Sequence, residues 1–332
     1  MYADEVAGGA HSSRSDEPAP DLFGGLRPTL AIIGAGRCGT ALAASATAAG
    51  YRVTVVHSRT AAHARALAER ARAGYAATPL AAVHAADLTL LTVPDPAIIP
   101  VAATLAASGT ALRGRALVHC SGSLGAAALA SLRQAAASIG AVHPLQALSD
   151  AGSGETLAGT FFAVEGDAPL VPVLERFVVD LGGVPFAAPF GDRALYHAAA
   201  VLAGNAPLAL LARASALLER AGVDPAVATQ ALATLLEGAA RNTRRLGPQR
   251  ALTGPVARND AATVRRHLEV LADDPATQRL YHRMARETLR TVGLVGREEV
   301  AAVLGATPVD APGRTRRRPT AAVRIPLGAA HV

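Results

Sequence analysis

A serine and a histidine stand in two short segments whose residue types could move a proton. Ser121 lies in the segment 118–123, and His143 lies in the segment 140–145. Both segments close an apolar run typical of a buried strand, and ligands collect at the carboxyl ends of parallel strands. A histidine titrates near neutral pH and can pass a proton to a reacting group. We therefore expect His143 to be a proton donor and Ser121 to hold or orient the substrate.

Three more polar residues stand out in the Ala-rich second half of the chain. His197 and Asn205 are eight residues apart, a spacing that puts both near one face of a helix. Two polar groups on an apolar stripe need partners, which are either a substrate or each other and water. Arg258 could bind a substrate carboxylate through two hydrogen bonds, or be one exposed arginine among many. We expect His197 to be a second catalytic candidate, Asn205 and Arg258 to contact substrate, and Asp260 to cap a helix.

The chain contains no lysine, which excludes a Schiff-base mechanism and a phosphate-binding lysine. It also lacks an HExxH segment, paired CxxC segments and acids at calcium-loop spacing, so we expect no metal. His119 and Cys120 lie beside Ser121, but a strand residue and a small core thiol are the roles we expect for them.

A glycine-rich segment has the spacing GxGxxG between a predicted strand at 29–33 and a predicted helix at 41–49. In such a segment the first glycine makes a tight turn, the second admits a pyrophosphate, and the third lets helix and strand pack closely. The helix N-terminus then offers free N–H groups to the phosphates. A second predicted strand at 52–56 completes the required context. The segment predicts a dinucleotide site made by Gly34, Ala35, Gly36, Arg37, Cys38 and Gly39.

The residues after the second strand indicate which dinucleotide is bound. NAD sites place an acid there to bind the ribose 2′-hydroxyl, but this chain has the run HSRT at 57–60. Arg59 can pair with a 2′-phosphate, and Ser58 and Thr60 can donate hydrogen bonds to it. The cofactor expected is therefore NADP(H). The backbone of Val93 and Pro94 could line the cofactor ribose, although the alternative is only a strand followed by a proline-started helix.

The elements that must position these residues alternate between strand and helix. Predicted strands at 29–33, 52–56, 88–93, 116–119, near 141 and at 160–164 favour an α/β fold with a doubly wound parallel Rossmann sheet. After about residue 191 only helices are predicted, at 194–221, 225–246, 260–272, 275–292 and 298–304, which makes an all-α C-terminal domain. The expected organisation is a disordered arm (1–27), a NADP-binding domain (28–190), a helical substrate and dimerisation domain (191–305) and a disordered basic tail (306–332).

Composition narrows the class of protein further. Of the 332 residues, 51% are hydrophobic but only 3% are aromatic, which argues against a surface that stacks nucleic-acid bases. The net charge of +6 owes much to the last 27 residues, so nucleic-acid binding is a weak inference. Two cysteines within predicted regular structure suit a reducing compartment. No secretory signal is visible and the apolar runs fall short of a membrane span, so we expect a cytoplasmic protein with no membrane partner.

Several strings resemble a known family when they are taken together: VHCSGS, VHPLQA, LYHAAAVLAGN and LTGPVARND, with the glycine segment. The chain resembles bacterial Rossmann-like proteins that carry a C-terminal domain of unknown function. These belong to the superfamily of 6-phosphogluconate dehydrogenase and ketopantoate reductase. The resemblance implies NAD(P)-dependent oxidoreductase activity and a homodimer formed through a helical C-terminal domain.

Two relatives bear on the chemistry. Ser121 and the pair His143-Pro144 are similar to the Ser and His-Pro of prephenate and arogenate dehydrogenases, whose histidine contacts the hydroxyl being oxidised. Ketopantoate reductases use a lysine with asparagines downstream, and here His197 and Asn205 stand at about those places. The missing lysine argues against ketopantoate reductase itself and leaves a histidine-based equivalent.

The sequence therefore predicts an NADPH-dependent reductase that acts on a small oxo-acid or related carbonyl compound, with proton transfer assisted by histidine. One alternative is a sensor or scaffold that binds NADPH without turnover. Another is an activity like that of prephenate or arogenate dehydrogenase, or of ketopantoate reductase. A third, nucleic-acid binding through the arginine-rich tail, predicts strongly salt-dependent binding.

Overall fold

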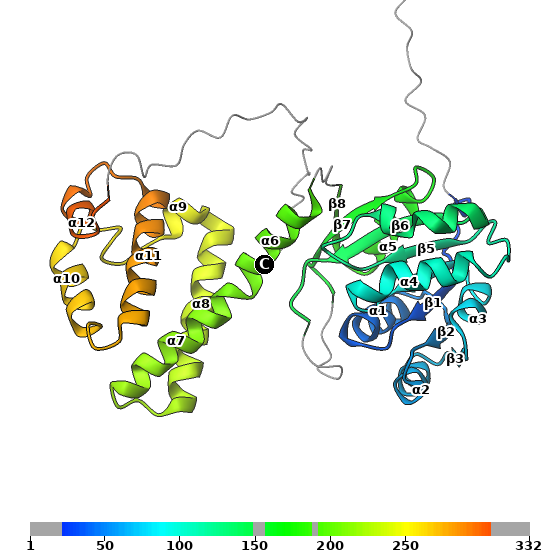
Figure 1. Ribbon diagram of the computed structural model, residues 1–332, viewed down its shortest axis with the longest axis horizontal. Helices are drawn as coiled ribbons and strands as arrows, with labels where there is room; N and C mark the ends of the chain where they lie inside the picture. The colour runs from blue at the N-terminus through cyan, green and yellow to red at the C-terminus, as the bar shows by residue number, and fades with distance from the viewer. Residues whose placement is uncertain (1–21, 149–156, 188–191, 307–332) are drawn as a thin grey trace, which may run out of the picture. The chain divides into compact units, whose positions relative to one another are not determined.

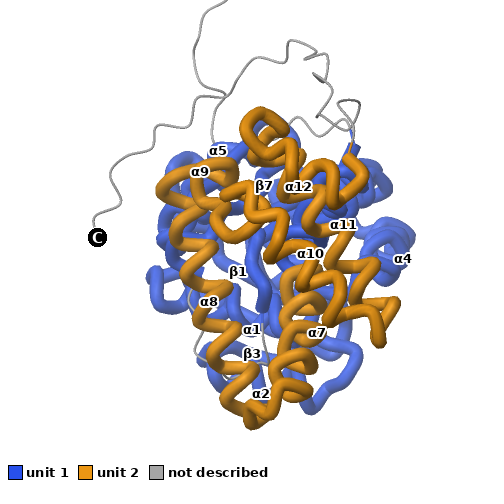
Figure 2. Tube along the Cα trace, turned by 90° about the vertical axis from the view of Figure 1, so that its left-hand side faces the viewer, with its two compact units in different colours: residues 1–204, 325–332 blue, residues 205–324 orange. Residues whose placement is uncertain are grey.

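The computed structural model describes residues 22–148, 157–187 and 192–306, and its helices and strands are labelled in Figure 1. The described residues form two compact units, one ending at Gly204 and the other starting at Asn205 (Figure 2). The predicted arm up to residue 21 and the predicted tail from residue 307 lie outside the described residues. Each unit is described separately below.

The first unit is built on one sheet, which within the described residues has eight strands in the order β3-β2-β1-β4-β5-β6-β7-β8. Its strands are β1 Leu30–Ile33, β2 Val53–His57, β3 Gly74–Tyr75, β4 Leu88–Leu91, β5 Ala116–His119, β6 Ser138–Pro144, β7 Phe161–Gly166 and β8 Val184–Ala187. All neighbours pair in parallel except β6 and β7, which are antiparallel. The predicted doubly wound sheet is confirmed, with one antiparallel pairing that the sequence did not predict.

Helices cover both faces of this sheet. They are α1 Arg37–Ala48, α2 Ala61–Arg70, α3 Pro79–His84, α4 Asp95–Ala106, the 3-10 helix η1 Ala126–Ala135 and α5 Val171–Asp180. Strand β1 shows why: Leu30 and Ile32 pack into one core cluster with Leu42 of α1, whereas Ala31 and Ile33 pack into another with Ile98 of α4. A strand buried on both faces is apolar throughout, as this one is. The last helix of this unit, α6 Arg193–Gly204, has no buried residues.

The second unit is helical throughout its described length. Its helices are α7 Ala206–Arg220, α8 Pro225–Leu246, α9 Pro248–Ala251, α10 Ala261–Val270, α11 Pro275–Val292 and α12 Glu298–Val303. Asp260 caps α10 by accepting a hydrogen bond from the Thr263 backbone N–H, which confirms the predicted N-cap. A small apolar core joins the last helices and includes Val264 and Leu289.

The expectation of a disordered arm through residue 27 is wrong for residues 22–27. Leu22 donates its backbone N–H to the carbonyl of Pro169. The Arg27 guanidinium lies 3.2 Å from the carboxylate of Asp180 and over the ring of Tyr51. These contacts hold the segment against the first unit, although its composition alone is typical of a loose terminus.

The predicted domain boundary after residue 190 also differs from the structure. Helix α6 belongs to the first unit, and the units divide between Gly204 and Asn205. The single helix predicted at 194–221 is two helices, because Pro207 has no N–H to continue the hydrogen bonding of α6. Asn205 therefore lies between α6 and α7, where the two units divide, and the helix face predicted for it and His197 stays a prediction.

The helical run Arg193–Arg220 is apolar but largely exposed. By length and composition, it is the one stretch of the described chain that could cross a membrane, whereas the sequence analysis expected no run of sufficient length. Only 6% of its most apolar window is buried. Leu195 and Leu202 of α6 and Leu208 of α7 are each more than half exposed. Each of these two helices therefore presents apolar side chains that no described residue covers.

Candidate functional site

The glycine segment turns tightly between β1 and α1, and its close contacts explain two of its glycines. Gly34 has φ +119°, and a Cβ there would lie 2.6 Å from the Thr92 carbonyl. A Cβ on Gly39 would lie 2.0 Å from the Gly34 carbonyl oxygen. The Thr92 hydroxyl donates a 2.6 Å hydrogen bond to that same oxygen and so ties the turn to the end of β4. Gly36 differs, because its missing Cβ would meet nothing within 4 Å.

A cleft of about 1000 Å³ opens above this turn. The predicted cofactor residues that line it are Gly34, Ala35, Gly36, Arg37, Ser58, Arg59, Thr60, Val93 and Pro94. It is also lined by residues that were not predicted: Ile33, His57, His63, Pro79, Thr92, Pro96, Ala97 and Val101. Of the predicted set, Gly39 is buried behind the turn, and Cys38 packs with Cys120 against the apolar core. A direct cofactor contact predicted for Cys38 is therefore not supported.

The cleft suits a dinucleotide that carries an extra phosphate. Gly36 begins α1 without a side-chain cap, and the first turn of α1 contains no acid, so the helix N-terminus can receive an anion. Arg37, Arg59, His57 and His63 line the cleft, and no carboxylate does so among the described residues. The donor set fits a 2′-phosphate better than a bare ribose hydroxyl.

The loop after β5 is shaped by hydrogen bonds of its own serines. Ser121 Oγ accepts the backbone N–H groups of Ser123 and Leu124 at 3.1 and 3.2 Å. Ser123 Oγ donates to the carboxylate of Asp95, at the start of α4, at 2.5 Å, and lies 3.3 Å from Ser121 Oγ. Because a carboxylate only accepts, the Ser121 hydroxyl is left to donate to Ser123. Ser121 thus holds its loop and links it to Asp95.

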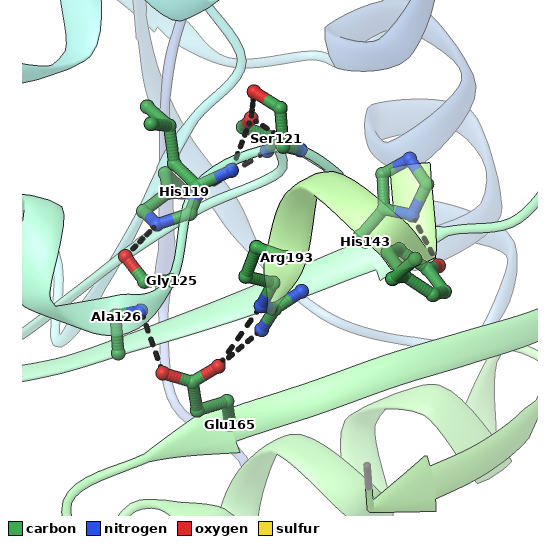
Figure 3. A network of polar contacts seen from close by, with 10 residues as sticks. His119, Ser121, Gly125, Ala126, His143, Glu165 and Arg193 are labelled. Atoms are coloured by element: carbon green, nitrogen blue, oxygen red, sulfur yellow. Dashed lines mark hydrogen bonds and ion pairs between the residues drawn. The ribbon is translucent and has the colours of Figure 1, made fainter. Parts of the chain in front are cut away.

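His119 is fully buried and fixes the start of this loop (Figure 3). Its Nε2 lies 2.9 Å from the Gly125 carbonyl oxygen and donates to it, while Nδ1 accepts the Ser121 backbone N–H at 3.2 Å. This pattern needs a neutral ring, and burial lowers the pKa of His119 accordingly. The structural role expected for His119 is confirmed.

His143 lies in β6, beside β5, and meets a tyrosine that the sequence analysis left out of the site. Its Nδ1 lies 2.7 Å from the hydroxyl of Tyr196 in α6, and the two rings pack edge to face. Burial, with the neighbouring charges of His197 and Arg193, lowers the pKa of His143 to about 4. His143 is therefore neutral near pH 7, and its predicted part in proton transfer stays a prediction.

His197 lies next to His143, over the loop that follows β5. A Cβ on Gly122 would lie 2.8 Å from the His143 ring and 3.1 Å from His197 Nδ1. The Nδ1 atom of His197 is buried and has no hydrogen-bond partner within the described chain. The structure thus brings together Ser121, His143 and His197, as expected, and adds Tyr196.

A buried ion pair fixes the helix that carries Tyr196 and His197. Arg193 starts α6, is 9% exposed, and pairs with the carboxylate of Glu165 on β7. The other carboxylate oxygen of Glu165 accepts the backbone N–H of Ala126, the first residue of η1 (Figure 3). Glu165 therefore joins the sheet, η1 and α6, which sets the position of Tyr196 against His143.

The predicted substrate contacts Asn205 and Arg258 belong to the second unit and remain predictions. The sequence analysis missed Asp95, Ser123, Tyr196, Glu165 and Arg193 as site residues. Tyr196 carried a usable signal, since it precedes His197 in an Ala-rich helix. Glu165 and Arg193 carried none, because they are 28 residues apart in the sequence and meet only in the folded chain.

The fold and the glycine turn define a Rossmann-type dinucleotide-binding protein. The family described as "NADP oxidoreductase coenzyme F420-dependent" matches residues 29–123, and "Domain of unknown function (DUF2520)" matches residues 160–288. The chain thus joins a Rossmann-like NADP oxidoreductase domain to a DUF2520 domain, which confirms the family expected from the sequence. No curated protein matches the chain.

Solved structures with the same fold include a presumed NADP oxidoreductase from Bacteroides fragilis, 28% identical, with a TM-score of 0.63 over 78% of this chain and 97% of that one. A protein from Thermotoga maritima is 24% identical, with a TM-score of 0.62 over 80% and 98%. A reductive aminase from Aspergillus terreus, solved with NADPH and ethyl levulinate, is 22% identical, with a TM-score of 0.59 over 84% and 99%. The family description and the Bacteroides fragilis structure bear out the expected cofactor, NADP(H).

Proposed function

We propose that the chain is an NADPH-dependent reductase of a small oxo-acid, or of a related compound with a C=O or C=N bond. The observation that carries this proposal is the 2.7 Å contact between Tyr196 and His143. His143 lies over Gly122, in the loop that Ser123 ties to Asp95 at the start of α4. Imines enter the proposal because similar folds include an imine reductase and a reductive aminase, each solved with a nicotinamide cofactor.

The bound cofactor would supply the hydride, and the residues of this chain would bind it and deliver the proton. The turn at Gly34 and Gly36 and the N-terminus of α1 hold the pyrophosphate. Arg59, with Ser58 and Thr60, holds the 2′-phosphate. The segment at Val93 and Pro94 lines the remaining cleft.

Proton delivery falls to Tyr196 rather than to a charged His143. Burial raises the pKa of Tyr196, so its hydroxyl is protonated at neutral pH and can give that proton to the reduced oxygen or nitrogen. A neutral His143 with its proton on Nδ1 then donates a hydrogen bond to the phenolate that forms. His143 thus assists the transfer while it stays neutral, and Tyr196 recovers its proton from water.

Charge suggests how a substrate is held. Asp95 places a carboxylate close enough to His143 to affect its pKa, and a protonated imine would be stabilised by that charge. An oxo-acid instead needs a cation for its carboxylate, which is the role predicted for Arg258. The two substrate classes therefore depend on different residues, Asp95 for imines and Arg258 for oxo-acids.

The test is NADPH oxidation, followed at its absorbance band, against 2-oxo acids, cyclic imines and dienoate acids. With the substrate found, Tyr196→Phe and His143→Ala should each lower kcat about 100- to 10,000-fold while NADPH affinity stays within about twofold. A matched control is Tyr281→Phe, because Tyr281 pairs with His267 at 2.8 Å in the second unit with the same ring geometry. Equal losses in Tyr281→Phe and Tyr196→Phe would contradict the proposal.

The sensor without turnover is the second candidate, favoured by the way Ser121 is engaged within its own loop. A sensor would bind NADPH, but none of the compounds in the panel would cause it to oxidise the NADPH. The His143→Ala variant would then have no turnover to lose.

We also propose that the chain forms a homodimer in which the apolar side chains of α6 and α7 pack against a second copy. We expect this dimer to be cytoplasmic and to have no nucleic-acid or membrane partner. The exposure of Leu195, Leu202 and Leu208 supports this assignment. An exposed apolar surface of this length is typical of a subunit interface.

A further inference from the structure

His57 is the last residue of β2 and lies where NAD-binding proteins place the acid that binds the ribose hydroxyl. It lines the cofactor cleft together with Arg59. The sequence analysis used the absence of an acid here but gave His57 itself no role. A titratable side chain at this position can do more than leave room for a phosphate.

One hydrogen bond decides which form of His57 can bind a phosphate. Its Nδ1 lies 2.9 Å from the carbonyl oxygen of Ala76, which can only accept, so Nδ1 carries a proton. Nε2 is then the ring nitrogen left for a ligand. In the neutral ring Nε2 has a lone pair and no proton, so it cannot donate a hydrogen bond to a phosphate oxygen, and the two lone pairs repel each other. In the protonated ring Nε2 donates a charge-assisted hydrogen bond instead.

We infer that His57 makes the preference for NADPH over NADH depend on pH, because only its imidazolium donates to the 2′-phosphate. This inference rests on the proposed function, since it requires that the cleft bind NADPH. Arg59 keeps its charge at every pH of interest and supplies the constant part of the recognition. His57 supplies a part that is present only when its ring is protonated.

The ionisable groups around His57 come from several elements. Arg37 at the start of α1, Arg59 before α2 and His63 in α2 line the same cleft. Strand β3 adds Tyr75, whose ring is covered by the Arg65 guanidinium. Strand β1 and helix α3 add no ionisable group to the cleft lining. No carboxylate lines this cleft among the described residues, so a bound 2′-phosphate would be the anionic partner of the His57 ring.

The experiment measures binding rather than turnover, by titrating NADPH, NADH, 2′,5′-ADP and 5′-AMP against the full chain at about pH 6 and about pH 8. His57→Asn is the test variant because asparagine stays neutral. The phosphate itself gains a proton near pH 6 and then binds less well. Because this affects wild type and His57→Asn equally, the ratio of their Kd values removes it. The ratio of variant to wild-type Kd for NADPH should rise about tenfold from the higher to the lower pH. The same ratio for NADH and 5′-AMP should stay constant.

Arg59→Ala is the matched control and separates two failures. This variant should weaken NADPH and 2′,5′-ADP more than NADH and 5′-AMP at both pH values, without changing the pH dependence that His57 gives. If the wild type binds none of the four probes, the proposed cofactor site is wrong. If it binds NADPH but the two pH profiles of wild type and His57→Asn run parallel, the role of His57 is wrong and the cofactor site stands.

Discussion

His143 is surrounded by groups that disfavour a positive charge on its ring. It is partly buried, His197 lies beside it, and Arg193 is close, while only the Asp95 carboxylate acts in the opposite sense. A carboxylate beside a histidine would have raised its pKa instead. The balance keeps the ring neutral at the pH where Tyr196 is protonated, and this pairing suits a hydrogen-bond relay.

The lowered pKa of His143 has a consequence for stability. Because the folded-state pKa of about 4 lies below the ordinary value of 6.5, the folded protein gains nothing from protonating His143 until the pH is well below neutral. This stabilisation is complete above about pH 6.5 and is lost as the pH falls towards about 4. It amounts to at most roughly 3 kcal/mol in the free energy of unfolding.

Urea unfolding at about pH 7 and about pH 4 measures this effect when wild type is compared with His143→Gln. The variant should lose less stability than the wild type between the two pH values, since it has no ring to protonate. His119 is also buried with a lowered pKa and contributes equally to both proteins, so the difference isolates His143. Parallel losses would contradict the pKa assigned to His143.

At this scale the sequence predicted residue types better than their roles. His143 and His197 both lie against Gly122, the residue after Ser121, because β5 and β6 end side by side. The roles changed because burial and loop hydrogen bonds cannot be inferred from residue order. Ser121 is tied into its own loop, and we propose Tyr196 in place of His143 as the proton donor.

At the scale of elements, the turn between β1 and α1 contains one glycine that the fold requires and another that we expect only cofactor binding to require. Gly39 packs against the backbone of the turn, where a side chain has no room. Gly36 faces open space, so its missing side chain serves whatever approaches α1. Two substitutions to alanine should therefore have opposite signatures.

Gly39→Ala should lower stability by roughly 1–3 kcal/mol and abolish NADPH binding, because the new Cβ overlaps the Gly34 carbonyl. Gly36→Ala should cost at most about 1 kcal/mol as a poorer N-cap, yet weaken NADPH binding at least about tenfold. Thermal unfolding and NADPH titration measure the two quantities separately. If Gly36→Ala binds NADPH like the wild type, the pyrophosphate does not approach α1 there.

Elements with a strong apolar period were predicted closely, such as α8 and α11, whereas short or atypical ones were not. β3 has two residues and β8 is only half-buried, so neither carries an apolar run that a sequence pattern could show. The antiparallel pairing of β6 with β7 depends on chain direction between two strands, which residue types do not encode.

At the scale of the whole molecule, the apolar run between residues 193 and 220 predicts that the protein is a dimer in solution. Light scattering after size-exclusion chromatography should give a mass near twice that of the chain. Leu202→Glu should shift the protein towards the monomer, because a charge would be buried at the interface. Val295→Glu is the control, since Val295 is 89% exposed in the second unit and lies outside α6 and α7. A monomeric wild type, or one that instead binds lipid vesicles, would contradict the dimer.

The division after Gly204 also bears on how proteins of this kind can be recombined. A gene fusion with its crossover at that point would keep Tyr196 and His197 with His143 and the cofactor cleft. It would exchange Asn205, Arg258 and everything that follows. A crossover at residue 190, where the strands end, would separate the tyrosine from its histidine. Chimaeras cut after Gly204 are therefore the ones in which substrate range can be exchanged while the proton chemistry is inherited intact.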